Sequence, residues 1–145
     1  MEILTTRPKK PLKDWKIVGK VAKVFNKEAK GYVIYLHEGA SIILPTNERY
    51  GLALVQSNIV FQMFLHPGKK HSIEIAVTDL EGVKRRLKFC PCKEIVKNPL
   101  HARIPNQSFK TGVWTNLSIC SNSFFLECFP GRTFRSIDLI YISGE

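Results

Sequence analysis

The cysteines are the residues of this sequence whose spacing comes closest to a chemical site. Cys90 and Cys92 flank Pro91 in the stretch FCPC, and Cys120 and Cys128 follow separately. A structural zinc ion usually takes two pairs of ligands at C-x₂₋₄-C spacing. This sequence has one C-x-C and no second pair, so we expect no bound metal and interpret Cys120 and Cys128 as buried thiols.

The histidines and small nucleophiles form no catalytic pattern. The sequence has no G-x-S-x-G, no H-E-x-x-H, no P-loop and no glycine-rich dinucleotide turn. None of the histidines has a neighbouring Ser or Cys in a recognisable arrangement; they are His37, His66, His71 and His101. We therefore expect a protein that is not an enzyme and that uses no cofactor and no small-molecule substrate.

The charge of the chain points to an acidic partner. The sequence has 145 residues, 44% of them hydrophobic, and a formal net charge of +10. A positive field of this kind speeds encounters with nucleic acid, acidic lipid or acidic protein. The longest apolar run, Gly51–Leu65, is interrupted by polar residues, and the N-terminus has no signal-like apolar core, so we expect a cytoplasmic chain without a membrane partner.

Short β-prone runs separated by turn residues predict an all-β protein, an antiparallel β-sandwich of two packed sheets. We expect one domain over residues 11–145, preceded by a flexible basic tail at residues 1–10. The expected strands are Lys16–Phe25, Gly31–His37, Ser41–Leu44, Ile59–Leu65, Ser72–Thr78, Val83–Cys90, Leu100–Ile104, Val113–Ile119 and Phe134–Ile142.

One segment has the pattern of a short α-helix. The stretch SNSFFLE begins with residues suited to capping a helix N-terminus, and Pro130-Gly131 follows it. The sequence therefore predicts a helix of one or two turns near residues 122–129. Its aromatic side chains, Phe124, Phe125 and Phe129, are expected to plug one end of the sandwich.

The most basic stretch is EGVKRRLKF, from Glu81 to Phe89. Side chains alternate between the two faces of a strand, so consecutive residues here separate into two sets. The set expected to face the core comprises Val83, Leu87, Phe89 and also Arg85. The set expected to face outward comprises Lys84, Arg86 and Lys88. We predict that these three outward cations bind an acidic partner.

The preceding strand, SIEIAVT, alternates as clearly and limits how the two strands can pair. Inward residues must face inward residues, so a hairpin between them needs an odd-numbered loop or a bulge. A five-residue loop places Glu74 opposite Lys88, and a three-residue loop places it opposite Arg86. An unpaired Arg85 on the core face would be costly. We therefore assign it a structural role near a sheet margin, with its guanidinium reaching a carboxylate or carbonyl groups.

A binding module for nucleic acid or glycan is the alternative function. A basic β-rich domain with exposed aromatic side chains can bind single strands by stacking. Few aromatic residues lie among the charges, however, and none forms the ring platform of an RNA-recognition motif. For glycan, the candidate stacking residues are Trp15, Tyr50 and Trp114.

Six segments, read in order, resemble the domain of the cilia- and flagella-associated protein twenty family, and most closely its "domain-containing" relative. The resemblance runs from about Pro11 to Gly144. It implies a β-sandwich with one short helix, jelly-roll-like and similar to carbohydrate-binding modules. The segments are DWKIVG, LPTNERYGLAL, VTDLEGVKRRLKF, NPLHARIP, VWTNLSI and TFRSIDLIYIS.

The resemblance implies a structural, non-enzymatic role in the cilium, axoneme, basal body or centriole, with tubulin or other axonemal or centriolar proteins as partners. Arg85 and Arg86 match the family's basic pair in this strand. Trp114 matches its tryptophan in the strand before the helix, which we interpret as a structural core residue. Because tubulin is acidic, an outward set of Lys84, Arg86 and Lys88 suits such a partner.

The sequence also departs from the family pattern. Family members usually begin with a further aromatic- and glycine-rich segment before the equivalent of PLKDW, and continue past YISG into another basic strand. We therefore expect this chain to lack the first and last strands of the family. Such a loss would leave unpaired strand edges and an open core.

Overall fold

The structure is a computed structural model that describes Leu4 and residues 11–144. It confirms an antiparallel-dominated all-β fold with one short helix. The tail expected at residues 1–10 lies, apart from Leu4, outside the described residues. In chain order the elements are β1 (Lys16–Val18), β2 (Val21–Asn26), β3 (Gly31–Leu36), β4 (Ser41–Leu44), β5 (Asn58–Phe64), β6 (His71–Asp79), β7 (Lys84–Cys90), β8 (Val96–Lys97), β9 (His101–Pro105), β10 (Trp114–Cys120), α1 (Ser121–Cys128) and β11 (Phe134–Gly144).

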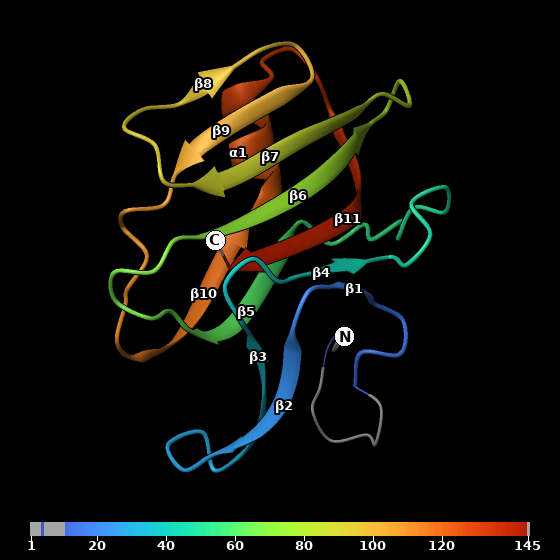
Figure 1. Cartoon of the computed structure of the whole chain (residues 1–145). Helices are drawn as coiled ribbons and strands as arrows, with labels where there is room; N and C mark the ends of the chain where they lie inside the picture. The colour runs from blue at the N-terminus through green and yellow to red at the C-terminus, as the bar shows by residue number, and fades with distance from the viewer. Residues whose placement is uncertain (1–3, 5–10, 145) are drawn as a thin grey trace.

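One large sheet forms the first layer of the sandwich. Its seven strands lie in the order β1-β4-β11-β6-β7-β9-β8, and all neighbours are antiparallel except β7 and β9. The second layer is formed by the β5–β10 pair, α1 and the base of the β2–β3 hairpin, whose side chains join those of the large sheet in one core. Figure 1 shows this hairpin projecting at the lower end of the molecule.

The β6–β7 hairpin adopts the register expected for a five-residue loop. Glu74 is opposite Lys88, and Thr78 is opposite Lys84. In this register the apolar side chains of the two strands share the inner face, where they are at most 1% exposed. These inner residues are Ile73, Ile75, Val77, Leu87 and Phe89. Period-two alternation therefore fixes both the pairing and the core face of this hairpin.

The helix lies within one residue of its expected position. Phe125 is fully buried in the core, and Phe129 directly after α1 is also buried. Phe124 contacts Phe89 of β7 edge to face, with 4.9 Å between ring centroids. The aromatic side chains of α1 thus cover the inner face of the large sheet.

Two features of the strand pattern differ from expectation. The single strand expected over Lys16–Phe25 is divided into β1 and β2, because Gly19 adopts a positive φ of 78° and turns the chain. A side chain at Gly19 would meet the Cα of Ala40 at 3.0 Å, so the turn also needs the missing Cβ. Strand β8, which pairs with β9 through two residues, lies in a segment expected to be a connection.

The outer face of the large sheet is not wholly exposed. Ala76 was expected to point outward and does so, yet it is buried beside Ile43 and Leu139 in a second, smaller apolar cluster. Thr78 is also buried, and it donates a hydrogen bond to Asp138. Residues on the outer side of the sheet are therefore buried near β4 and β11 and more exposed near β7 and β9.

The segment after β4 packs closely against β11. Leu52 N–H donates to the Asp138 carbonyl, and Ala53 N–H donates to Asp138 Oδ1 at 2.9 Å. Leu54 then forms a bridge with Ile137. Gly51 lies so close that an added Cβ would overlap Asp138 Oδ1 and lie 2.8 Å from its Cγ.

We predict that Gly51→Ala lowers the free energy of unfolding by about 1–3 kcal/mol, because the new methyl group must displace the Asp138 carboxylate or the segment that binds it. The matched control is Gly31→Ala, where the nearest atom to the new Cβ is a carbonyl oxygen at 4.0 Å. Urea unfolding of the two variants measures the difference. Equal stability of the two variants would show that the contact between Gly51 and Asp138 is loose.

Candidate partner-binding face

Strand β7 separates its cations between the two faces of the large sheet. Arg85 points to the core side, and its side chain is 7% exposed. Lys84 is exposed on the outer side, where Arg86 and Lys88 are partly exposed. The strand therefore carries one buried cation and three that reach the outer surface.

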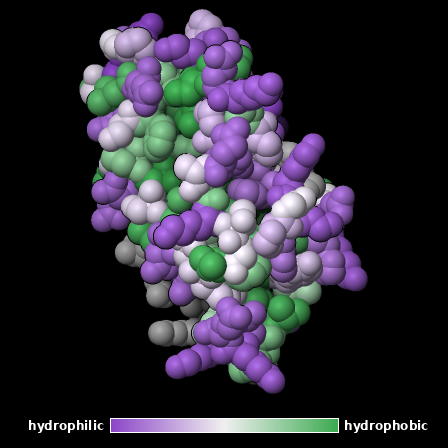
Figure 2. All heavy atoms as spheres, turned by 90° about the vertical axis from the view of Figure 1, so that its left-hand side faces the viewer, coloured by the Kyte–Doolittle hydropathy of each residue, from purple (hydrophilic) through white to green (hydrophobic). Residues whose placement is uncertain are grey.

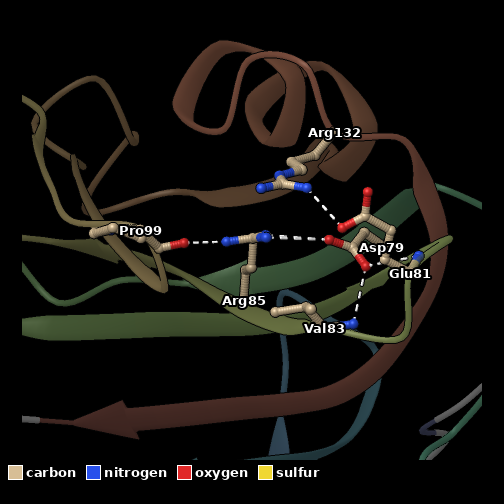
Figure 3. A network of polar contacts seen from close by, with 6 residues as sticks. All are labelled: Asp79, Glu81, Val83, Arg85, Pro99 and Arg132. Carbon is tan, nitrogen blue, oxygen red and sulfur yellow. Dashed lines mark hydrogen bonds and ion pairs between the residues drawn. The ribbon is translucent and has the colours of Figure 1, made fainter.

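The buried guanidinium of Arg85 has partners on two sides (Figure 3). Its Nη2 lies 3.2 Å from Asp79 Oδ2, and its Nη1 donates to the carbonyl of Pro99. Its Cζ also lies 5.5 Å from the centroid of the Phe129 ring, a cation–π distance. These contacts offset the cost of burying the charge of Arg85.

The position of Arg85 in the sheet differs from the expected margin. It is the second residue of β7, close to the end of the strand, but β7 itself is an interior strand between β6 and β9. Burial is possible there because β9 begins one residue later, at the partner of Arg86, and leaves the Pro99 carbonyl available.

Asp79 connects the buried cation to the β6–β7 turn. Its Oδ1 accepts hydrogen bonds from the backbone N–H groups of Glu81 at 3.0 Å and Val83 at 2.9 Å. Burial alone would raise the pKa of Asp79, but the bonds from Val83, Arg85 and Glu81, together with the charge of Arg85, lower it overall. The carboxylate therefore stays ionised inside the protein.

On the outer side, Arg86 is held by carboxylates. Its Nη1 lies 2.9 Å from Glu74 Oε1, and its Nη2 lies 3.7 Å from Glu48 Oε2. Glu74 is also opposite Lys88 in the strand register. The charge of Arg86 is therefore largely compensated, which the sequence did not indicate because Glu48 lies in a distant loop.

Strand β9 brings a further cation to the same surface. It runs parallel to β7, with Lys88 beside Arg103 and Arg86 beside His101. Ala102 and Ile104 point into the core, so Arg103 is exposed on the outer side. Alternation within HARIP would have revealed this orientation, but not the parallel pairing. We call Lys84, Arg86, Lys88 and Arg103 the basic face.

Asp138 lies behind one end of this basic face. Burial alone would raise its pKa, but hydrogen bonds from Thr78, Ala53 and Ser136 and the nearby charge of Lys84 lower it overall. The charge of Lys84 thus acts on the Asp138 carboxylate as well as on the outer surface.

The tryptophan and the cysteines singled out from the sequence are not part of the basic face. Trp114, at the start of β10, is partly buried, with its ring centroid 5.9 Å from that of Phe64. Cys90 and Cys128 are buried, while Cys92 and Cys120 are partly exposed. Within the described part of the chain, no three His, Cys, Asp or Glu side chains are grouped so as to hold a metal ion.

We predict that Arg85→Gln lowers the free energy of unfolding by about 3–5 kcal/mol, because it leaves the Asp79 carboxylate buried without its charged partner. The same change at Arg86 should cost about 0–1 kcal/mol, because that ion pair is partly exposed. Urea unfolding at neutral pH distinguishes the two variants. A larger loss from Arg86→Gln would contradict the assigned facing of β7.

The lowered pKa values of Asp79 and Asp138 predict how stability depends on pH. The unfolded chain takes up protons at these groups at higher pH than the folded protein does, so they stabilise the fold fully above the unfolded-state pKa of about 3.9. The stabilisation is lost as pH falls through that value toward the lower folded-state pKa. We expect Asp79→Asn to be less stable at neutral pH and to lose less stability between about pH 5 and pH 2.

Unfolding free energies of the wild type and Asp79→Asn, measured across this range, test the expectation. If the two proteins lose the same amount of stability in acid, the carboxylate of Asp79 does not contribute through its ionised form.

No helix among the described residues is long and apolar enough to span a membrane.

The sequence matches the family description "CFA20 domain" over residues 1–145, the whole length of the chain, and the name of that family refers to cilia and flagella. The chain therefore belongs to the CFA20 domain family.

Proposed function

We propose that this protein is a non-enzymatic structural domain that attaches to microtubules, or to another acidic axonemal or centriolar assembly, through the basic face. The observation that carries the proposal is the placement of Lys84, Lys88 and Arg103 on the outer side of two adjacent strands of one sheet. Membership of a family named for cilia and flagella supports the setting.

The geometry of the basic face suits a broad acidic surface. The backbones of β7 and β9 fix the spacing of the Cα atoms, so only the side chains of the cations need to be ordered when a partner binds. Arg86, anchored by Glu74, stabilises the middle of the face while its neighbours extend the positive charge. Complementary charge of this kind mainly raises the association rate and fixes orientation.

Histidine contacts also favour a structural role over catalysis. His37 packs edge to face on Tyr35, with 4.6 Å between ring centroids, and His66 contacts the same tyrosine at 5.8 Å. His71 stacks on Phe109 at 6.2 Å. Such contacts join loops and strands by ring packing.

The second candidate is a module that binds single-stranded nucleic acid or glycan. It is favoured by exposed aromatic rings outside the basic face: Tyr50 is 73% exposed, Phe25 60% and Tyr32 55%. Lys23 lies over the Tyr32 ring at 5.1 Å, so a cation accompanies one of these rings. Binding of homopolymeric RNA or DNA with a steep dependence on salt concentration would favour this function over the first.

Co-sedimentation with taxol-stabilised microtubules tests the first proposal. We predict that charge reversal of Lys84, Lys88 and Arg103 to Glu reduces pelleting several-fold at low salt, because it replaces attraction to the acidic lattice by repulsion. Arg86 is left intact so that its bond to Glu74 still supports the strand.

The matched control reverses three exposed lysines elsewhere, Lys13, Lys20 and Lys110, and so has the same net charge. It should pellet nearly as well as the wild type. Equal losses in the two triple variants would show that only total charge matters, and no pelleting by the wild type would remove the microtubule as a partner.

A further inference from the structure

The second layer of the sandwich contains a wide cleft. The β5–β10 pair and the β2–β3 hairpin are separate two-stranded sheets, and β3 and β5 line a common cleft of about 2050 Å³. Its floor includes Ile42, Ile140 and Ile142, which belong to the inner side of the large sheet. This volume exceeds the roughly 300–1000 Å³ typical of small-molecule pockets.

Among the described residues, no strand pairs with the edge of β5 that faces this cleft. In an antiparallel pair, alternate residues direct their N–H and C=O groups to the partner strand and away from it. Because Ser121 N–H donates to the Ser57 carbonyl, alternation directs Ile59 and Phe61 to β10. The backbone groups of Asn58, Val60 and Gln62 therefore face away from β10, and these residues line the cleft.

The hairpin presents a second edge of the same kind. His37 N–H donates to the Lys20 carbonyl, so the alternation directs Val33 and Tyr35 to β2. The backbone groups of Tyr32, Ile34 and Leu36 point away from β2, and these residues also line the cleft. The rings of Tyr35 and His66 lie 5.8 Å apart, so the C-terminal ends of β3 and β5 approach each other at one end of the cleft.

The lining of the cleft combines apolar surface with a positive rim. Val60 is 63% exposed on β5, although it is a β-branched residue suited to pairing with another strand. Figure 2 shows apolar and hydrophilic residues intermixed at the lower end of the molecule, where the hairpin lies. The described lining includes Lys23, Lys30, Lys69 and Lys70 and two carboxylates, Glu28 and Glu38. Lys69 is paired with Glu38 at 3.2 Å, and the lining as a whole keeps an excess of positive charge.

We propose that this cleft is the docking site for an extended, acidic segment of a partner polypeptide, which adds a strand to the free edge of β5. Main-chain hydrogen bonds to Asn58, Val60 and Gln62 would provide affinity, as in other cases of strand addition. Alternate apolar residues of the segment would face the apolar floor, and its carboxylates would meet the lysines of the rim.

The site is separate from the basic face. The cleft opens on the inner side of the large sheet, whereas the basic face is on its outer side, so the two surfaces can be occupied together. The proposal therefore does not depend on the microtubule assignment, and each can fail without the other.

Hydrogen–deuterium exchange on the full chain tests the proposal with a defined probe, the synthetic peptide Ac-EEVTVTVEE-NH2. We expect the peptide to slow exchange at the amides of Asn58, Val60 and Gln62, while those of Ile59 and Phe61, already bonded to β10, change little. The peptide Ac-KKVTVTVKK-NH2 should bind more weakly, because its charges repel the rim.

Two variants at one position separate backbone pairing from side-chain effects. Val60→Pro removes an N–H that points away from β10, and a free edge tolerates proline, so we expect peptide affinity to fall about tenfold or more. Val60→Thr keeps the N–H and a β-branched side chain, and should bind like the wild type. If Val60→Pro does not fold, the peptide can be changed instead: N-methylation at the amides of alternate residues removes its N–H donors to β5. This peptide should then bind the wild-type protein more weakly.

Several results would overturn the proposal. The first is hydrogen–deuterium exchange at the Val60 amide that the peptide does not change. The second is equal affinity of the protein for Ac-EEVTVTVEE-NH2 and Ac-KKVTVTVKK-NH2. The third is equal affinity of Val60→Pro and Val60→Thr for Ac-EEVTVTVEE-NH2. Light scattering that shows a dimer closing the same edge would assign the cleft to a second copy of the chain. Binding that appears only after removal of residues 1–10 would assign it to the chain's own N-terminal segment.

Discussion

The ion pair between Asp79 and Arg85 is the interaction on which the candidate binding surface depends. Asp79 binds the backbone of the β6–β7 turn and the guanidinium of Arg85 at the same time, so it fixes the loop length and hence the register of the hairpin. The register decides which side chains of β7 face outward. Arg85 also binds the carbonyl of Pro99, which ties the start of β9 to the same strand.

A buried ion pair is not by itself evidence of high stability, because desolvation of both charges offsets most of their attraction. The effect of the Asp79–Arg85 pair is on the specificity of strand register. A one-residue slip of β7 would bring Arg86 to the core side and Arg85 outward, and Arg86 would then have to replace Arg85 at Asp79 and Pro99. The same slip would turn Leu87 and Phe89 outward, so alternation already favours the observed register. The ion pair adds to that preference by binding Arg85 on the core side.

The features that could be predicted from the sequence are those set by local periodicity. Alternation in SIEIAVT and EGVKRRLKF was sufficient to place Arg85 inward and Lys84 outward. The polar residues that begin SNSFFLE and the Pro130-Gly131 that follows it located the helix. Other features required knowledge of distant segments: Arg103 reaches β7 by parallel pairing, and Glu48 reaches Arg86 from a loop. The division between β1 and β2 depended on the conformation of Gly19, which composition alone does not give.

The two layers of the sandwich differ in the length of their edge strands, and this difference decides where another polypeptide can contact the domain. The large sheet ends in short strands, β1 of three residues and β8 of two, which limits pairing with other chains at its edges. In the part of the chain that the structure describes, the second layer has longer edges at β3 and β5 that pair with no strand and border the cleft. An added strand is therefore accommodated more readily in the second layer, whereas the large sheet is suited to contact through its charged outer surface. If both proposed surfaces bind their partners, the domain acts as a connector, because the cleft and the basic face lie on opposite sides of the large sheet.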